Sequence, residues 1–318
     1  MKRILALLLC IFAAAALVSC GGGEEQGALQ NDYSEQSVFS ESGWRRTVIY
    51  YLSDEGYIVP VMKRIPWEEG IGKAAVSCLI CTPENMAATA GLGFSPMIPN
   101  GSSVSLRIDE SEHATLDITG FTQLDSAETE VNMITAIVNT LVEFPSVETV
   151  SITVNGKGGK LKNGTKLPEN SPHIGLNPEK SEIETSELGM LYSTTLYFPN
   201  DSCSLNVPIT VYNTYELTFS DAVNALIKGS GQKGLRCCFP EGTRLLEAGI
   251  TDGKATVNLS SAFLDTALSP GVDEAAYQTL FLTASRFGSI NELAILVDGV
   301  PYVFTSGEPA PPLYVNEF

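Results

Sequence analysis

Apolar residues recur at helical spacing between residues 128 and 141, which predicts a helix with one buried stripe of side chains. The stripe consists of Val131, Ile134, Ile137, Val138 and Leu141. We expect the helix to end near Phe144-Pro145, because alternating apolar and polar residues over 147–154 then predict a strand. Asn155-Gly156 follows and predicts a tight turn.

The same helix, strand and turn occur again downstream. Residues 287–290 match 144–147, and residues 293–299 match 150–156, with a constant register (287 − 144 = 299 − 156 = 143). A unit that is used twice predicts two copies of one domain.

The first copy opens with two β-branched and aromatic runs, 48–52 and 57–62, which predict strands. An apolar stripe predicts a helix over 67–81, and residues 104–108 and 114–118 predict a hairpin before the repeated unit. The order is therefore β-β-α-β-β-α-β. It predicts an α+β fold in which helices pack on a mostly antiparallel sheet.

The second copy repeats this order. Residues 195–198 predict its first strand, 219–228 its first helix and 273–287 its second helix. Strands over 244–250 and 254–259 flank Asp252-Gly253, a strong hairpin signal. Two copies fit a chain of 318 residues, which is long for a single core.

These patterns divide the chain into six segments. We expect a signal peptide, a lipidated tether, a first domain, a linker that runs over the surface, a second domain and a Pro-rich tail. Their bounds are 1–19, 20–46, 47–156, 157–190, 191–305 and 306–318.

The N-terminus has the layout of a secretory signal, with a basic start at 1–3 and an apolar core over 4–18. Leu17-Val18-Ser19-Cys20 resembles the bacterial lipobox, in which the cysteine is lipidated and becomes the new N-terminus. An ordinary signal peptide with an incidental cysteine is the alternative. The lipobox predicts a lipid anchor on Cys20 and a place at the extracytoplasmic face of the cell membrane.

Charge narrows the set of partners. The chain carries a net charge of −18, which becomes about −20 when Lys2 and Arg3 leave with the signal (37 acidic − 17 basic). Such a surface disfavours nucleic acid and anionic lipid headgroups as direct partners.

The order of elements resembles the GerMN domain, which occurs in tandem in GerM-type sporulation and germination lipoproteins. The resemblance rests on the opening strands, on Ile98-Pro99-Asn100-Gly101 with Phe239-Pro240-Glu241-Gly242, and on the repeated terminal unit. It covers nearly all of the mature chain. It implies a lipid-anchored extracytoplasmic protein of spore-forming bacteria without known catalysis, linked to germination, cortex formation and the channel complex between mother cell and forespore.

Five cysteines remain beyond Cys20, and their state is open. They are Cys78, Cys81, Cys203, Cys237 and Cys238. Cys78 and Cys81 have CxxC spacing on one face of a predicted helix, which allows buried thiols, a disulfide, or a metal or redox site. Cys237-Cys238 is a vicinal pair, for which buried thiols are the default. An odd number of exported cysteines argues against a complete disulfide framework.

Other candidate chemistry is sparse. His113 is expected in an exposed hairpin and His173 in the linker. Asp117 and Asn258 occupy matching strand positions, where we expect them to face solvent. The acidic pairs Glu68-Glu69 and Asp273-Glu274 fall at predicted helix starts, where the helix dipole favours them. We therefore predict no catalytic residue, cofactor or metal.

The sequence thus predicts a binding or scaffold protein and not an enzyme, with envelope proteins or peptidoglycan as partners. Two similar modules on one tether raise avidity through effective concentration. One alternative is an enzyme acting on cell-wall glycan, which requires a cleft with two carboxylates. The other is a solute-binding lipoprotein, which requires larger parallel α/β lobes.

Overall fold

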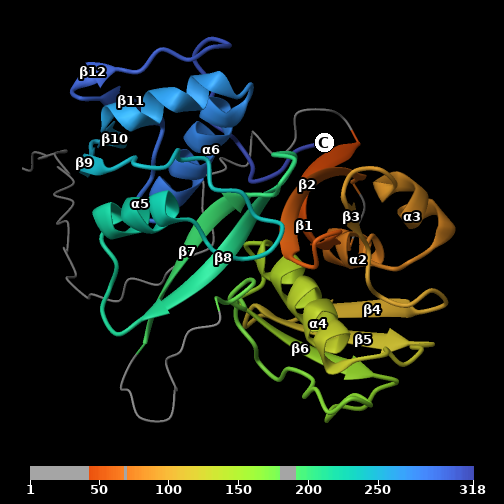
Figure 1. Cartoon of the computed structure of the whole chain (residues 1–318). Coiled ribbons are helices and arrows are strands. Elements are labelled where there is room, and N and C mark those ends of the chain that lie inside the picture. The colour runs from red at the N-terminus through yellow and green to blue at the C-terminus, as the bar shows by residue number, and fades with distance from the viewer. Residues whose placement is uncertain (1–42, 68–69, 180–190) are drawn as a thin grey trace, which may run out of the picture.

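The computed structural model describes residues 43–67, 70–179 and 191–318, and it contains two copies of one α+β domain side by side (Figure 1). The signal peptide, Cys20, the tether up to residue 42, Glu68-Glu69 and residues 180–190 lie outside the described residues. The elements of the first copy are β1 (Trp44–Ser53), β2 (Ile58–Pro66), α2 (Ile71–Ser77), α3 (Pro83–Thr89), β3 (Phe94–Ser95), β4 (Ser103–Ile108), β5 (His113–Thr119), α4 (Ala127–Val142) and β6 (Thr149–Val154).

The first copy has two sheets with α4 packed between them and against both. One sheet has the order β2-β1-β3 and is antiparallel. The other has the order β4-β5-β6, in which β5 and β6 run parallel. The α4 stripe buries Ile137 and Leu141 completely, opposite the equally buried Leu116 of β5 and Ile49 of β1. Burial of this apolar surface is the main stabilising contribution to the domain.

The second copy repeats this plan. Its elements are β7 (Tyr192–Pro199), β8 (Asn206–Asn213), α5 (Phe219–Lys228), β9 (Leu245–Thr251), β10 (Lys254–Leu259), the 3₁₀ helix η1 (Ser261–Leu268), α6 (Val272–Ala284), β11 (Glu292–Val297) and β12 (Val300–Pro301). Strands β7 and β8 pair alone, and the second sheet has the order β12-β11-β10-β9, with β10 and β11 parallel. The predicted α+β fold with mostly antiparallel pairing is confirmed.

The helix predicted over 67–81 is wrong in its extent. Helix α2 ends at Ser77, and the chain begins a second helix, α3, at Pro83. Thr82 caps α3 by accepting a hydrogen bond from the Asn85 backbone N–H at 3.2 Å, and Pro83 suits the first helical position. The predicted range therefore contains one helix of seven residues, and the next helix begins outside it.

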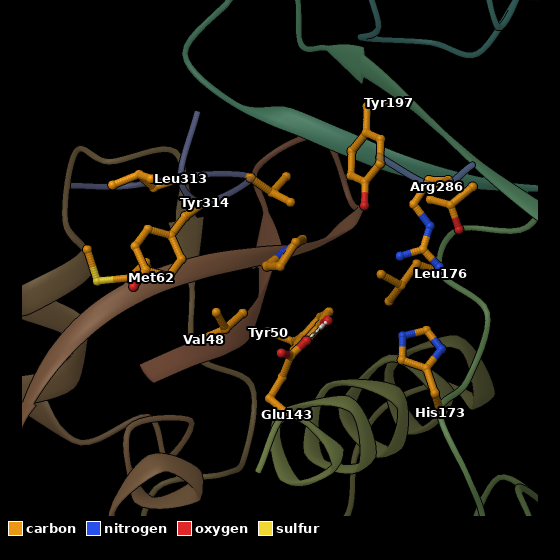
Figure 2. Close-up of a pocket in the computed structure, with 13 residues that line it drawn as sticks. Val48, Tyr50, Met62, Glu143, His173, Leu176, Tyr197, Arg286, Leu313 and Tyr314 are labelled. Atoms are coloured by element: carbon orange, nitrogen blue, oxygen red, sulfur yellow. Dashed lines mark hydrogen bonds between the residues drawn. The ribbon is translucent and has the colours of Figure 1, made fainter. Parts of the chain in front are cut away.

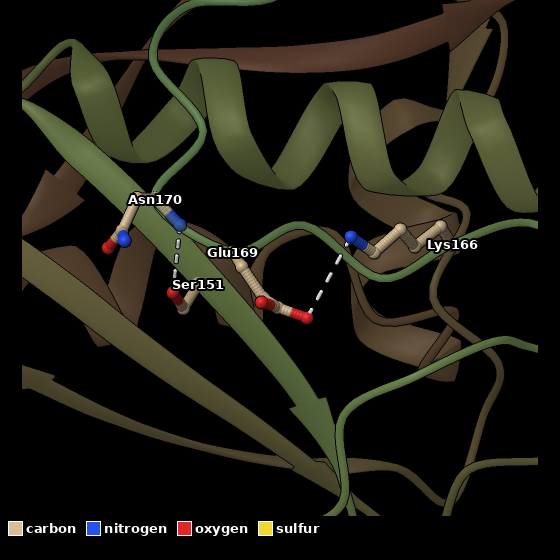
Figure 3. A network of polar contacts seen from close by, with 4 residues as sticks. All are labelled: Ser151, Lys166, Glu169 and Asn170. Carbon is tan, nitrogen blue, oxygen red and sulfur yellow. Dashed lines mark hydrogen bonds and ion pairs between the residues drawn. The ribbon is translucent and has the colours of Figure 1, made fainter.

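We predicted that the linker runs over the surface, but part of the segment after β6 is buried. It turns back along β6, where Ser171 exchanges two backbone hydrogen bonds with Val150, at 2.8 and 2.9 Å. Asn170 donates its backbone N–H to Ser151 Oγ at 3.1 Å beside the Lys166–Glu169 ion pair (Figure 3). Leu167 and Leu176 are buried. We call residues 157–179 the first strap.

The C-terminal tail of the second copy behaves in the same way. Residues 302–318, the second strap, follow the last strand and return to the boundary between the copies, where Val315 and Asn316 are buried. No helix in the described residues is long and apolar enough to cross a membrane.

Candidate functional site: the inter-domain seam

Strands β2 and β8 face each other across the boundary between the copies, and one asparagine from each strap joins them. Asn177 of the first strap accepts the Ile58 backbone N–H at 2.8 Å through Oδ1. Its Nδ2 donates to Ile58 O at 2.8 Å and to Pro208 O at 2.7 Å. One side-chain amide therefore connects β2 of the first copy to β8 of the second.

Asn316 of the second strap makes the mirror set of contacts. Its Oδ1 accepts the Asn206 backbone N–H at 2.7 Å. Its Nδ2 donates to Asn206 O at 3.0 Å and to Pro60 O at 2.9 Å. The contacted positions are equivalent in the two copies, because their numbers differ by a constant (206 − 58 = 208 − 60 = 148).

The two straps also add backbone contacts to the same strands. Thr210 N donates to Leu176 O at 2.8 Å, and Met62 N donates to Asn316 O at 2.8 Å. An amide side chain carries both a donor and an acceptor, so it suits backbone groups that no neighbouring strand satisfies. We call Asn177, Asn316 and the strand positions they contact the inter-domain seam.

A small hollow lies at the centre of this seam. Residues of both copies and both straps line it, among them Tyr50, Glu143, His173, Tyr197 and Arg286 (Figure 2). Its volume of about 60 Å³ holds a few water molecules. A space of this size does not admit a saccharide unit.

Tyr50 and Glu143 form a short hydrogen bond in the hollow. The Tyr50 hydroxyl donates to Glu143 Oε1 at 2.5 Å (Figure 2). Burial raises the pKa of Tyr50 well above its usual value, and the neighbouring carboxylate raises it further. Burial also raises the pKa of Glu143, against the opposing effects of the Tyr50 hydrogen bond and the Arg286 charge. Tyr50 is therefore a neutral donor at physiological pH.

The duplication places different side chains at equivalent positions of the hollow. Tyr50 corresponds to Tyr197, and Glu143 corresponds to Arg286 at the register of the repeated helices (286 − 143 = 143). The Arg286 guanidinium favours the ionised forms of Glu143, Tyr50 and Tyr197 through its charge. One copy thus contributes a carboxylate and the other a guanidinium.

The tyrosines are held by a contact that both copies share. Tyr50 N donates to Thr140 Oγ1 of α4 at 3.0 Å, and Tyr197 N donates to Thr283 Oγ1 of α6 at 3.2 Å. Both threonines are completely buried. The hydroxyls satisfy backbone N–H groups that the neighbouring strands β2 and β8 leave unpaired.

His173 of the first strap lies at the rim of the hollow, with its ring turned towards it (Figure 2). Partial loss of solvent around the ring, and secondarily the Arg286 charge, lower the pKa of His173 to about 4. Water still reaches the side chain, which is exposed. The imidazole is therefore neutral at pH 7.

The other predicted residues lie away from the seam. We expected Cys78 and Cys81 to share one face of a helix. Cys78 instead follows the last residue of α2, so the two cysteines share no helical face. The Cys81 thiol donates to Pro96 O at 3.3 Å, and both cysteines are free thiols. His113 is half-buried, with Nδ1 2.8 Å from Thr149 Oγ1.

Asp117 and Asn258 stabilise turns, a role beyond the solvent-facing one we predicted. Asp117 Oδ1 accepts the backbone N–H of Gly156 at 2.7 Å, and Asn258 Oδ1 accepts that of Gly299 at 2.9 Å. Each residue therefore fixes the Asn-Gly or Asp-Gly turn of its copy.

Two buried carboxylates at the starts of α4 and α6 hold the straps. Glu130 accepts the Asn163 backbone N–H at 2.9 Å, and Asp273 accepts that of Thr305 at 3.0 Å. Burial opposes ionisation of both groups, but these hydrogen bonds outweigh it and lower the pKa of each. The helix dipole, our sequence-based explanation for Asp273, acts beside these contacts.

The seam residues were absent from our predicted sites. Asn177 and Asn316 fall in segments with little apolar periodicity, and Glu143 and Arg286 lie just beyond the ends of α4 and α6, where no motif marks them. The signal that could have found the charged pair is the constant register of 143, which aligns Glu143 with Arg286. In the described part of the chain, no three His, Cys, Asp or Glu side chains are placed to hold a metal ion.

Comparison with known families identifies the class of this protein. The family model named Germane, described as "Sporulation and spore germination", matches residues 48–160 and 195–303, one match in each copy. The chain therefore belongs to the Germane family, which confirms the predicted resemblance.

The chain is similar to the spore germination protein GerM of Bacillus subtilis (strain 168), with 23% identity over 289 residues. These cover 87% of this chain and 76% of GerM. The solved tandem GerMN domains of the sporulation protein GerM from Bacillus subtilis have the same fold as this chain, with a TM-score of 0.69 and 22% identity. That match covers 86% of this chain and 99% of the solved one. Both names state a process and not a reaction.

Proposed function

We propose that this protein is a lipid-anchored scaffold at the extracytoplasmic face of the cell membrane that acts in envelope assembly during sporulation or germination. Family membership supports the process, and the signal and lipobox ending at Cys20 support the location. The observation that carries the scaffold role is the seam. Asn177 and Asn316 fasten two domains into one unit, and a binding surface on such a unit has a fixed geometry.

The structure of the hollow and of the sheets gives little support to a glycan hydrolase or to a solute-binding lipoprotein. A glycan hydrolase needs two carboxylates across a cleft. The hollow at the seam has one carboxylate, Glu143, which already accepts the Tyr50 hydroxyl. A solute-binding lobe pair is built on larger parallel sheets. Among the named strands of the described residues, each copy has a single parallel pair, β5 with β6 and β10 with β11.

The lipid anchor has a direct test. The N-terminal peptide of the protein purified from membranes should begin at Cys20 and carry a diacylglycerol group by mass spectrometry. Cys20→Ala should abolish both the modification and the processing. A mature N-terminus at another residue, without lipid, would contradict the anchor.

The scaffold role is tested with the soluble form, residues 21–318, immobilised as bait for membrane and envelope extract. Purified peptidoglycan is tested in parallel. We expect retention of defined envelope proteins or peptidoglycan without cleavage. A variant with both Asn177→Ala and Asn316→Ala should lose partners that bind across both domains. Release of soluble muropeptides by the wild type would overturn the scaffold proposal and favour the hydrolase.

A further inference from the structure

The turn between β7 and β8 carries a cysteine in an unusual conformation. Cys203 has a φ of 57°, a region that few residues other than glycine adopt. Asn200 organises the turn, because its Oδ1 accepts the backbone N–H groups of Ser204 at 2.9 Å and Leu205 at 3.1 Å. The position of Cys203 is thus fixed by the turn around it.

The turn is also fastened to the segment before β9. Asp201 N donates to Gly234 O at 3.0 Å, and Arg236 N donates to Pro199 O at 2.8 Å. This segment ends in the buried Cys238, and the Cys203 and Cys238 side chains lie close enough that each shifts the pKa of the other. Two cysteines 35 positions apart (238 − 203) therefore meet across backbone that the fold already holds together.

We propose that Cys203 and Cys238 are a redox-sensitive pair that closes to a disulfide outside the cytoplasm. The oxidant belongs to the class of disulfides, either a small-molecule disulfide or the disulfide of a thiol oxidoreductase. Cys237, which is exposed, takes no part in the bond: its thiol points to the carbonyl groups of Leu226, Ile227 and Phe239.

The chemistry of the pair suits this exchange. A hydrogen bond from Cys238, together with the positive charge of Arg236, lowers the pKa of Cys203 to about 6, whereas the pKa of Cys238 is raised. Cys203 is half-buried and therefore reachable. It is the thiolate that attacks disulfides, so Cys203 reacts first.

The exchange balances in two steps. Cys203 thiolate attacks one sulfur of the external disulfide, which forms a mixed disulfide and releases the first thiolate. Cys238 then loses its proton to water or to the released thiolate and attacks Cys203 Sγ, which closes the internal bond and releases the second thiolate. Two protein thiols are oxidised and one external disulfide is reduced to two thiols.

The bond would act on the contact between the two domains. Asn200 Nδ2 donates to Glu55 Oε1 at 2.9 Å, and the Tyr57 hydroxyl donates to Lys233 O at 2.7 Å. Both segments that the disulfide joins therefore touch the turn between β1 and β2 of the first copy. Oxidation fixes this side of the boundary.

The test uses residues 21–318, equilibrated at pH 7.5 with oxidised glutathione and compared with the protein in dithiothreitol. The count of free thiols should fall from five to three, because five cysteines are free in the reduced protein. Tryptic peptides 181–228 and 237–244 should become linked. We also expect the Tm to rise by roughly 5 °C, since the bond restricts the unfolded chain.

Variants assign the bond. Cys237→Ser should still lose two thiols and form the same linked peptides, whereas Cys203→Ser and Cys238→Ala should not form them. In the reduced wild type, iodoacetamide at pH 7 should modify Cys203 about tenfold faster than Cys81, whose pKa is raised by burial. No loss of thiols in oxidised glutathione, or a bond through Cys237, would overturn the proposal.

Discussion

The two copies of the domain agree where they build the fold and differ where they meet. In both, a buried threonine of the last helix accepts a strand N–H (Thr140 and Thr283), and a strap asparagine joins β2 to β8 (Asn177 and Asn316). At the centre of the boundary the copies diverge, and Glu143 of one corresponds to Arg286 of the other.

This difference teaches how a duplicated chain specifies its own pairing. Two identical copies could associate with like copies of another chain as readily as with each other. With Glu143 and Arg286 at equivalent positions, pairing of like copies brings two carboxylates or two guanidinium groups together, whereas pairing of first with second brings opposite charges together. Such repulsion against the wrong partner is a general route to specificity.

The largest effect is expected from the shared asparagine contacts. Asn316→Ala removes three hydrogen bonds from buried backbone groups of Pro60 and Asn206, so the free energy of unfolding should fall by about 3 kcal/mol. Chemical denaturation measures it. Asn224→Ala, on the exposed face of α5, is the matched control and should change stability by less than about 0.5 kcal/mol. Equal effects of the two variants would show that the seam adds no stability.

The next effect concerns the pair that differs. Arg286→Glu places two carboxylates at equivalent positions and should lower the free energy of unfolding by about 2 kcal/mol. The double variant Glu143→Arg with Arg286→Glu restores opposite charges and should recover at least half of that loss. A double-mutant cycle from denaturation curves gives the coupling directly. A coupling near zero would show that the charges of Glu143 and Arg286 do not stabilise the contact between the copies.

A smaller, equal effect is expected from the shared threonines. Thr140→Val and Thr283→Val keep the side-chain shape but leave the N–H of Tyr50 or Tyr197 without its acceptor. Each should cost about 1 kcal/mol of unfolding free energy. Thr140→Ser retains the hydroxyl and should cost less than Thr140→Val. A large effect in one copy alone would mean that the duplicated contact has lost its role in the other.

The smallest effect is a pH dependence from His173. Its pKa is lowered to about 4 in the folded protein, so the unfolded chain binds more protons between about pH 4 and the ordinary value of 6.5. The contribution of His173 to the free energy of unfolding is therefore complete above pH 6.5 and is lost as the pH falls towards 4. Because water reaches the ring, we expect less than about 1 kcal/mol. His173→Gln should flatten the stability profile over this range, and an unchanged profile would contradict the assignment.

The sequence predicted those parts of the fold that local patterns determine. Asp252-Gly253 marks the β9–β10 hairpin, and the apolar stripe predicted for α4 is buried except at Val131, which is 49% exposed. The helix expected over 67–81 is shorter, because Leu79 and Ile80 are buried after α2 has ended, where Ile80 forms a bridge to Ile98.

The seam could not be predicted in this way. Asn177 and Asn316 each contact one strand of the first copy more than a hundred positions away in sequence, and an asparagine in a polar segment looks like a surface residue. Neither composition nor periodicity reports such long-range contacts of backbone with side chain. The alignment of the two copies points instead to the charged pair, Glu143 with Arg286.

Differential scanning calorimetry of residues 21–318 tests the central claim, that the seam makes two duplicated domains into one cooperative unit. We predict a single transition for the wild type, with equal calorimetric and van't Hoff enthalpies, and two separate transitions for the Asn177→Ala, Asn316→Ala variant. Two independent transitions in the wild type, unchanged by the substitutions, would contradict the claim.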